Sequence, residues 1–172
     1  TSLKKVTFSG ENNLTTIGQQ AFLNCTSLTK VDFLSRVTSM GSYVFGNCSS
    51  LKTVEWPSAI TTIPNNTFDG CTVLEFEIPS NITKIGSNAF KNCDAFVRVV
   101  IPDGVTELGS YAFSSCDNLK EIVISDNCLI SNKLVGMAEY SPKLTSIRIP
   151  PLVTEIGYDN FRGCTTLAEV IW

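Results

Sequence analysis

The chain contains no histidine among its 172 residues. Histidine is the usual general base near neutral pH and the commonest zinc ligand, so its absence counts against hydrolytic and metal-dependent enzymes. Charge is also sparse, with 13 basic and 16 acidic residues and a net charge of −3. A weakly acidic chain has no general electrostatic footprint for nucleic acid or for anionic lipid.

Long apolar runs are missing too, and none approaches the ~20 residues that a membrane-spanning helix needs. The sequence begins with threonine and carries no signal-peptide pattern, so we expect a processed chain or a piece of a longer one. Hydrophobic residues nevertheless make up 43% of the chain and charged residues 17%. This composition favours an ordered domain with a substantial core.

A two-residue signature, phenylalanine followed three positions later by cysteine, recurs along the sequence. The successive cysteines of these pairs are 23, 23, 22, 23 and 48 residues apart, so the last interval holds one degenerate repeat. The pairs are Phe22–Cys25, Phe45–Cys48, Phe68–Cys71, Phe90–Cys93, Phe113–Cys116 and Phe161–Cys164.

Each repeat has a strand-like part and a turn-like part. After most of the cysteines comes Leu-x-x-Val/Ile-x-Ile, as in LKTVEW and LKEIVI, whose alternation is the period of a strand with one buried face. A proline often ends this strand because it lacks the N–H that would continue a ladder. A second apolar pair then precedes a glycine, which predicts a tight or positive-φ turn at Gly18, Gly41, Gly86, Gly109 and Gly157, with Pro64 in that place in one repeat.

The stretch Ala-Phe-x-x-Cys is too short for a full helix, and we predict a single helical or 3₁₀ turn that places both side chains in the interior. One repeat cannot bury its own apolar face, so the repeats must stack with equivalent side chains about 4.8 Å apart. The predicted fold class is α/β. It is a single right-handed solenoid domain over residues 1–172, of about seven repeats of 22–25 residues. A parallel sheet forms the concave face, and short helical or 3₁₀ turns and short strands lie opposite. The inward ladder of its eight strands would be Val6, Val31, Val54, Phe76, Val99, Ile122, Ile147 and Val170.

The combined pattern Cys-x-x-Leu-x-x-Ile-x-Ile-Pro and Val-Thr-x-Ile-Gly-x-x-Ala-Phe resembles the BspA-like leucine-rich repeats, over nearly the whole chain. This family occurs in bacterial and protozoan surface proteins. The resemblance implies a secreted or surface-attached protein, extracellular in location, that binds host matrix proteins or other cells. Fold alone does not fix function.

The pattern fails over residues 125–140, where Val-Thr-x-Ile-Gly is missing. Here Ser141 occupies the cysteine position, Ala138 occupies the phenylalanine position, and Cys128 is out of register with the other six cysteines. An irregular repeat can form a loop that carries function, or it can be a decayed repeat with a rough surface, which we favour. Cys128 could be exposed and reactive or buried.

Four interpretations compete for the six phased cysteines. Disulfides would suit a surface protein, but side chains of a ladder point in parallel and seven cysteines leave one unpaired. Zinc needs four converging ligands, and a nucleophile needs an activating partner. We therefore predict no metal and no cofactor, and small buried structural thiols at Cys25, Cys48, Cys71, Cys93, Cys116 and Cys164.

Outward positions of the strands offer a candidate contact surface. In stacked repeats Val100 and Val123 would form a small exposed apolar patch bordered by charged side chains, and such patches mark interaction sites. The alternative is that valine is there for its strand propensity. The predicted partner-binding residues are Arg98, Val100, Glu121, Val123 and Arg148.

Both ends of the sequence lack a polar capping repeat, so we expect a fragment of a longer array, or end-to-end self-association through uncapped repeats. The function we predict is non-enzymatic: a protein-binding or adhesion module, with extracellular matrix or another cell surface as partner. Nucleic acid and direct membrane insertion are not expected. A passive spacer that projects another domain is the alternative, and an enzyme is disfavoured because histidine and convergent polar clusters are missing.

Overall fold

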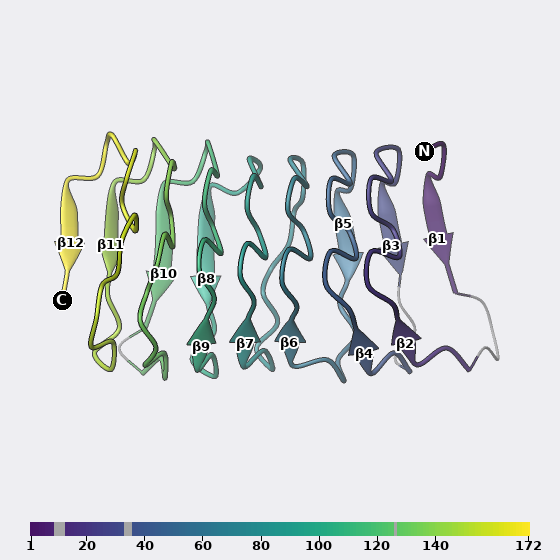
Figure 1. Cartoon of the computed structure of the whole chain (residues 1–172), viewed down its shortest axis with the longest axis horizontal. Helices are drawn as coiled ribbons and strands as arrows, with labels where there is room; N and C mark the ends of the chain where they lie inside the picture. The colour runs from purple at the N-terminus through teal and green to yellow at the C-terminus, as the bar shows by residue number, and fades with distance from the viewer. Residues whose placement is uncertain (9–12, 33–35, 126) are drawn as a thin grey trace.

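Parallel strands stack side by side along the molecule in the computed structural model, which describes residues 1–8, 13–32, 36–125 and 127–172 (Figure 1). One face, here called the long-strand face, carries most strands of three or four residues. These are β1 (Lys5–Thr7), β3 (Lys30–Asp32), β5 (Thr53–Glu55), β8 (Arg98–Ile101), β10 (Glu121–Ile124), β11 (Ser146–Arg148) and β12 (Glu169–Ile171).

The opposite face, here called the short-strand face, carries two-residue strands. These are β2 (Thr16–Ile17), β4 (Ser39–Met40), β6 (Thr62–Ile63), β7 (Lys84–Ile85) and β9 (Glu107–Leu108). An isolated parallel bridge between Leu134 and Ile156 extends this face toward the C-terminal end. The chain therefore visits both faces once per repeat, as the two-part sequence pattern predicts.

The strand register confirms most of the predicted inward ladder. Val6 pairs with Val31 and Val31 with Val54, and Ile122 pairs with both Val99 and Ile147. The predicted continuous sheet of eight strands is wrong, however. The described residues of the long-strand face form two separate sheets, β1-β3-β5 and β8-β10-β11-β12, and no strand forms around Phe76.

The predicted helical or 3₁₀ turns, and with them the α/β class, are also wrong. No described residue lies in a helix, so this part of the chain offers none that is long and apolar enough to cross a membrane. Each turn instead holds two residues with φ between 53° and 78°, four positions apart, and a left-handed residue interrupts any helix. These pairs are Gln20 and Asn24, Tyr43 and Asn47, Asn66 and Gly70, Asn88 and Asn92, Tyr111 and Ser115, Gly136 and Tyr140, and Asp159 and Gly163.

The turns are instead hydrogen-bonded to one another, as strands are. The N–H of Phe45 donates to Thr67 O, that of Phe68 to Ala89 O, and that of Phe90 to Ala112 O, each over 2.9 Å. This third ladder holds the phenylalanines in register. Rings of Phe22, Phe45, Phe68, Phe90 and Phe113 stack nearly parallel, with neighbouring centroids 5.3–5.6 Å apart. The stack forms the centre of the core.

The recurring glycines after the first one serve close approach between repeats, and none of the five serves a positive-φ turn. None of Gly18, Gly41, Gly86, Gly109 and Gly157 has positive φ among the backbone angles of the described residues. A Cβ atom added at Gly109 would lie 2.3 Å from Ser87 N, and one at Gly86 would lie 2.6 Å from Asn65 N. A side chain at Gly86 or Gly109 would push neighbouring repeats apart, whereas a Cβ atom added at Gly18, in the first repeat, meets no atom within 4 Å.

The degenerate repeat keeps the coil through polar side chains. Ser141 and Ala138 are buried at the positions that the sequence assigns to the missing cysteine and phenylalanine. The Asn132 side-chain amide donates to Leu108 O over 2.9 Å, and its oxygen accepts from Leu108 N over 3.1 Å. This side chain replaces the backbone partner that a regular repeat would supply to β9. Cys128 is buried as well, with 1% of its surface exposed.

Candidate functional site: a cleft at the sheet interruption

The interruption of the long-strand sheet coincides with the one repeat interval of 22 residues. The segment CTVLEFEIP, residues 71–79, is one residue shorter than CSSLKTVEWP, residues 48–57, and the missing residue falls between Leu74 and Phe76. Leu74 is buried and Phe76 packs against the core, so both apolar side chains still point inward.

Along a strand, the direction of the side chains and the direction of the backbone N–H and C=O groups both alternate with a period of two. When one residue is lost, a residue whose side chain points inward therefore directs its N–H and C=O groups to the opposite side from the equivalent residue of a regular repeat. Glu75 N still donates to Lys52 O over 2.8 Å, as Lys52 N donates to Thr29 O. Phe76 then turns its ring into the core one position early. Its backbone groups are therefore out of phase with the ladder, and the apolar burial prevails over strand pairing.

The edge of β8 is consequently left without a neighbouring strand. Lys120 N and Glu121 N both donate to Val97 O, so the backbone groups of Val97, Val99 and Ile101 face β10. Those of Arg98 and Val100 face the other way, toward residues 75–79. Among the described residues, no backbone hydrogen bond joins 75–79 to 98–101. The N–H and C=O groups of Arg98 and Val100 thus form an internal sheet edge.

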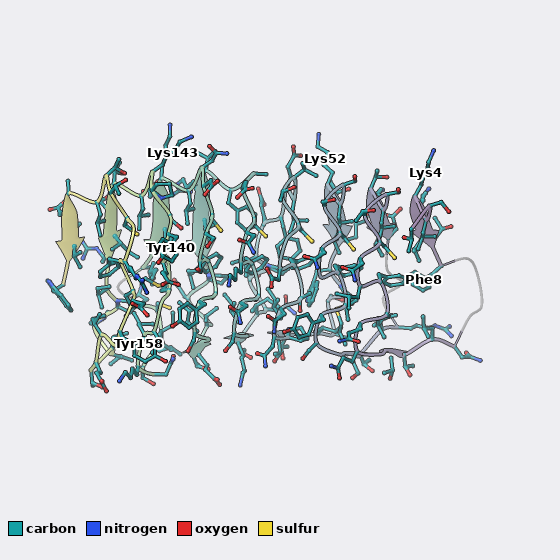
Figure 2. The ribbon with its side chains drawn as sticks, turned by 45° about the horizontal axis from the view of Figure 1, so that its top comes forward. Lys4, Phe8, Lys52, Tyr140, Lys143 and Tyr158 are labelled. Carbon is teal, nitrogen blue, oxygen red and sulfur yellow. The ribbon has the colours of Figure 1, made fainter. Side chains whose placement is uncertain are left out.

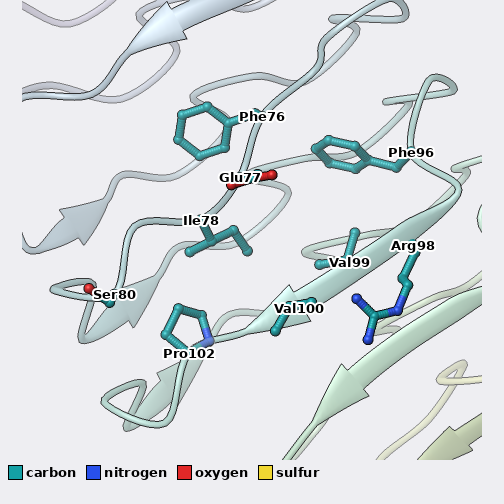
Figure 3. A pocket seen from close by; sticks show the side chains of 9 residues that line it. All are labelled: Phe76, Glu77, Ile78, Ser80, Phe96, Arg98, Val99, Val100 and Pro102. Atoms are coloured by element: carbon teal, nitrogen blue, oxygen red, sulfur yellow. The ribbon is translucent and has the colours of Figure 1, made fainter.

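A cleft of about 480 Å³ lies along this edge (Figure 3). Its lining takes consecutive residues from both sides, and side chains of consecutive strand residues point to opposite faces of a sheet. A cavity that touches both Val99 and Val100, on the side of β8 that has no backbone partner, borders this strand edge. We call this space, between residues 74–80 and β8, the seam. Lining side chains come from Phe76, Glu77, Ile78, Ser80, Phe96, Arg98, Val99, Val100 and Pro102.

A second hollow of about 480 Å³ continues the seam toward the start of the same strand. It shares Phe76, Glu77, Phe96 and Arg98 with the first, and Val97 lies at its wall. Because the two hollows share four residues, they are parts of one groove along the rung. An apolar groove with few convergent polar groups is typical of binding sites rather than of catalytic ones.

The floor of the seam is aromatic. The Phe76 ring centroid lies 5.1 Å from that of Phe68 and 5.7 Å from that of Phe90, and Phe96 lies 5.6 Å from Phe90. Two valines are exposed beside it, Val97 by 51% and Val100 by 48%. The floor is therefore tied to the central phenylalanine stack, while its rim offers apolar surface to solvent.

The rim of the seam carries more acidic than basic side chains. Glu77 is exposed and has no ion-pair partner among the described residues, whereas Glu75 lies 3.3 Å from Lys52. Arg98 Nε donates to Glu121 Oε2 over 2.9 Å, with both side chains half exposed. Exposed pairs of this kind contribute little stability, so they can rearrange around a ligand.

The five predicted partner-binding residues fall into two groups. Arg98 and Val100 line the seam. Glu121, Val123 and Arg148 line a smaller hollow of about 170 Å³ on the same face, between β10 and β11. Val123 is half-buried there, so the predicted exposed Val100–Val123 patch is limited to its first member. Sequence reasoning did not point to Phe76, Ile78, Phe96 and Pro102, although the 22-residue interval was the available signal.

The thiols form a separate column under the turns. From the second repeat on, the phased thiols donate hydrogen bonds to the previous repeat: Cys71 Sγ to Phe45 O over 3.1 Å, Cys93 Sγ to Phe68 O over 3.2 Å, and Cys116 Sγ to Phe90 O over 3.2 Å. In the degenerate repeat Ser141 Oγ donates to Phe113 O over 3.2 Å. The serine therefore takes over the cysteine's hydrogen bond.

Burial keeps these thiols protonated and poorly nucleophilic. Desolvation raises the pKa of Cys48 and that of Cys116 to about 12 each, and it also raises the pKa of Cys71 and of Cys93. Cys164 differs from the prediction of a buried thiol because it is only half-buried. All seven cysteines are free, and the described residues hold no group of three or more potential ligands that could bind a metal ion.

Known proteins place this architecture in a family. A leucine-rich repeat protein from Bacteroides ovatus is 30% identical, with a TM-score of 0.87 over 98% of this chain and 45% of its own. The chain thus spans less than half of that protein. The Treponema protein described as T. pallidum leucine rich repeat protein is 27% identical, with a TM-score of 0.77 over 90% of this chain and 72% of its own.

No curated protein matches the chain in sequence. The family model of the BspA type leucine rich repeat region matches residues 1–76 and 61–172, in six copies. The sequence signature, the stacked parallel strands and both structural relatives agree with this match. The chain therefore belongs to the BspA-type leucine-rich repeat family.

Proposed function

We propose that the chain is a non-enzymatic protein-binding or adhesion module of a secreted or cell-surface protein, and that it binds its partner through the long-strand face. The observation that carries this proposal is the seam, an apolar groove on an otherwise regular stack of strands. A regular solenoid presents an extended surface to partners, and exposed apolar patches mark contact sites. The surface location is supported by what the family resemblance implies.

The face also has the electrostatic character of a protein contact surface. Arg98 and Glu121 form an ion pair next to the exposed Val100, and a polar rim around a small apolar centre is the usual anatomy of protein interfaces. Nothing in this arrangement requires a cofactor. Host matrix glycoproteins and cell-surface proteins are the partners that we propose.

Binding of the 172-residue chain to a panel of matrix glycoproteins and to whole cells tests the proposal. Val100→Asp places a charge at the exposed centre of the face and should weaken binding at least tenfold. The matched control is Thr16→Asp, which changes an exposed strand residue on the short-strand face and should bind like the parent. Circular dichroism checks that both variants fold.

Equal loss of binding in both variants would move the contact away from the long-strand face. A chain that binds no member of the panel would favour a passive spacer, whose surface needs no contact site.

A further inference from the structure

We propose that the seam binds an extended segment of a partner protein, which adds to the edge of β8 as a strand. This inference rests on the proposed protein-binding function and specifies its mode. The segment that fits has alternating apolar residues and a basic side chain opposite Glu77. Its backbone would pair with the N–H and C=O groups of Arg98 and Val100 that face the cleft.

The backbone edge is the first reason. Strand addition uses a row of unpaired donors and acceptors, and the ladder between β8 and β10 leaves Arg98 and Val100 with theirs on the seam side. This cleft touches both Val99 and Val100 and both Glu77 and Ile78, and among the described residues no backbone hydrogen bond joins 75–79 to 98–101, so the cleft borders the unpaired edge of β8.

The dimensions and side chains are the second reason. Residues 74–80 border the groove on one side, and seven residues of extended chain span about 20 Å at ~3.3 Å per residue. The groove is therefore as long as a strand of ordinary length. Inward side chains of an added strand would meet the Phe76 and Phe96 rings, and outward ones would lie beside Val100 (Figure 3). Val97, which lines the second hollow, would lie beside the start of the added strand.

Charge is the third reason, and it selects the sequence of the segment. Glu77 lines both hollows of the seam and has no ion-pair partner among the described residues. Arg98, the basic residue of the lining, already pairs with Glu121. A basic side chain on the bound segment would complement Glu77, whereas an acidic one would be repelled by it.

The test uses an acetylated, amidated heptapeptide in which lysine and valine alternate, titrated into the 172-residue chain by calorimetry. We expect saturable binding accompanied by slower amide exchange at Val100. Two further peptides, N-methylated on all lysines or on all valines, remove the backbone donors of one strand edge at a time. At least one of them should bind at least tenfold more weakly.

Two variants of the chain complete the test. A threonine inserted between Glu75 and Phe76 restores the spacing of residues 51–57, should close the seam, and should abolish peptide binding while the chain stays folded by circular dichroism. Glu77→Lys should weaken binding at least tenfold. Glu169→Lys, an exposed residue of β12 on the same face, is its matched control and should leave binding unchanged.

Several outcomes would overturn strand addition. Equal binding of all three peptides would show that the backbone is not read, and unchanged binding by the insertion variant would place the peptide elsewhere. A dimer that forms in light scattering and disappears on insertion would assign the seam to a second copy of the chain. If the chain binds a matrix glycoprotein or cells, and the insertion variant binds them equally, this inference fails while the proposed function stands.

Discussion

Cys116 illustrates what one side chain contributes to each repeat. It is fully buried, its thiol donates to Phe90 O over 3.2 Å, and a thiol can donate only while it holds its proton. Burial raises its pKa to about 12, so the folded chain keeps that proton well above neutral pH. The column of thiols therefore stabilises the stack by hydrogen bonds between repeats as well as by packing.

Stability should for this reason decline at alkaline pH. Below pH of about 8.5 the thiol is protonated in both states, and its contribution is fully present. Above that pH the unfolded chain loses the proton first, so the free energy of unfolding falls by up to about 1.4 kcal/mol per pH unit per thiol until the folded pKa of about 12 is reached. Urea unfolding of the reduced chain at pH 7.5 and pH 10.5, beside Cys116→Ser, measures this fall.

The serine variant separates the effect of the Cys116 thiol on stability from the effects of lysines and tyrosines, which titrate in the same pH range. Serine does not ionise there, and Ser141 already makes the equivalent hydrogen bond in the degenerate repeat. The parent should lose more stability between the two pH values than Cys116→Ser. The same loss in both chains would contradict the assignment.

The recurring glycines allow a second residue-scale prediction. Gly109→Ala puts a Cβ atom 2.3 Å from Ser87 N and 2.4 Å from Gly86 C, both backbone atoms of the preceding repeat. Such overpacking should lower the free energy of unfolding by about 1–3 kcal/mol or more. Thermal and urea unfolding of the purified variant measure the change.

Gly18→Ala is the matched control, because no atom lies within 4 Å of its added Cβ and its φ is not positive. It should leave stability unchanged or raise it by up to about 1 kcal/mol. Equal destabilisation by both substitutions would show that the glycine is needed for the turn itself.

These glycines also show the limit of inference from sequence at this scale. A positive φ and a close backbone approach both select glycine, so the pattern predicts the residue's importance without its reason. The cysteine column behaves similarly, since spacing predicts burial but the hydrogen bond to the previous repeat depends on where the coil places each carbonyl. Val123 is only half exposed and lines the hollow between β10 and β11, which no local pattern in the sequence reveals.

At the scale of elements, the seam shows how one residue decides whether a strand forms. Between Leu74 and Phe76 the chain has one residue, whereas between Leu51 and Val54 it has two. Burial of the Phe76 ring on Phe68 and Phe90 contributes more than the ladder that the strand would form. The strand of this repeat is therefore lost although its sequence, LEFEIP, alternates as a strand should.

A threonine inserted between Glu75 and Phe76 should restore the missing strand. The insertion makes residues 71–79 equal in length to residues 48–57, so Phe76 can turn inward while its backbone stays in phase with β5 and β8. Amide exchange of Val100 should slow by at least tenfold as its N–H gains a partner, and the melting temperature should rise. A threonine inserted into the loop after Asp103, in a turn that makes no strand pair, is the control and should not slow exchange at Val100.

The repeat period, the two strands per repeat and the inward ladder follow from the sequence because each is repeated many times. The interruption occurs once, at Phe76, and its consequence depends on competition between side-chain burial and strand pairing. Taken alone, the alternating pattern of LEFEIP is compatible both with burial of its apolar side chains and with strand pairing. Only the hydrogen bond from Glu75 N to Lys52 O, in the neighbouring repeat, shows that burial of the Phe76 ring conflicts with strand pairing.

At the scale of the whole molecule, the interruptions of the two strand faces are staggered (Figure 1), and side chains fill the space between these faces along the stack (Figure 2). The short-strand sheets are β2-β4 and β6-β7-β9, with a break between β4 and β6. Pro64 lies at this break. In the preceding repeat the equivalent residue, Gly41, donates its N–H to Ile17 O, but proline has no N–H to donate. A hollow of about 320 Å³ lies there, as one does at the seam.

Each break is bridged by the opposite face. Strands β3 and β5 pair across the first break, and β6-β7-β9 pair across the seam. The phenylalanine stack runs past both. A repeat protein is stabilised by interfaces between neighbours, so its cooperativity depends on the weakest interface. At the seam, the short strands pair over only two residues each. Much of the coupling between the repeats on either side therefore depends on the phenylalanine stack and on the hydrogen bonds between the turns.

Phe90→Ala should therefore divide the molecule into two unfolding units. Phe90 is fully buried and stacks on Phe68 at 5.5 Å, across the seam, and on Phe113 at 5.3 Å, beside the paired strands β8 and β10. Removing the ring costs about 3–5 kcal/mol and deletes the contact that links the repeats on either side of the seam. Amide exchange in increasing urea should show residues 98–125 and residues 36–70 opening at different concentrations.

Phe113→Ala is the control for this division. Phe113 is equally buried and stacks on Phe90 at 5.3 Å, where β7 pairs with β9 and β8 pairs with β10. It should lose a similar free energy of unfolding and keep one cooperative transition, because the long-strand sheet still couples its neighbours. If Phe90→Ala also unfolds in one transition, the turn ladder and the short-strand sheet suffice to couple the two sides, and the seam is a surface feature without consequence for cooperativity.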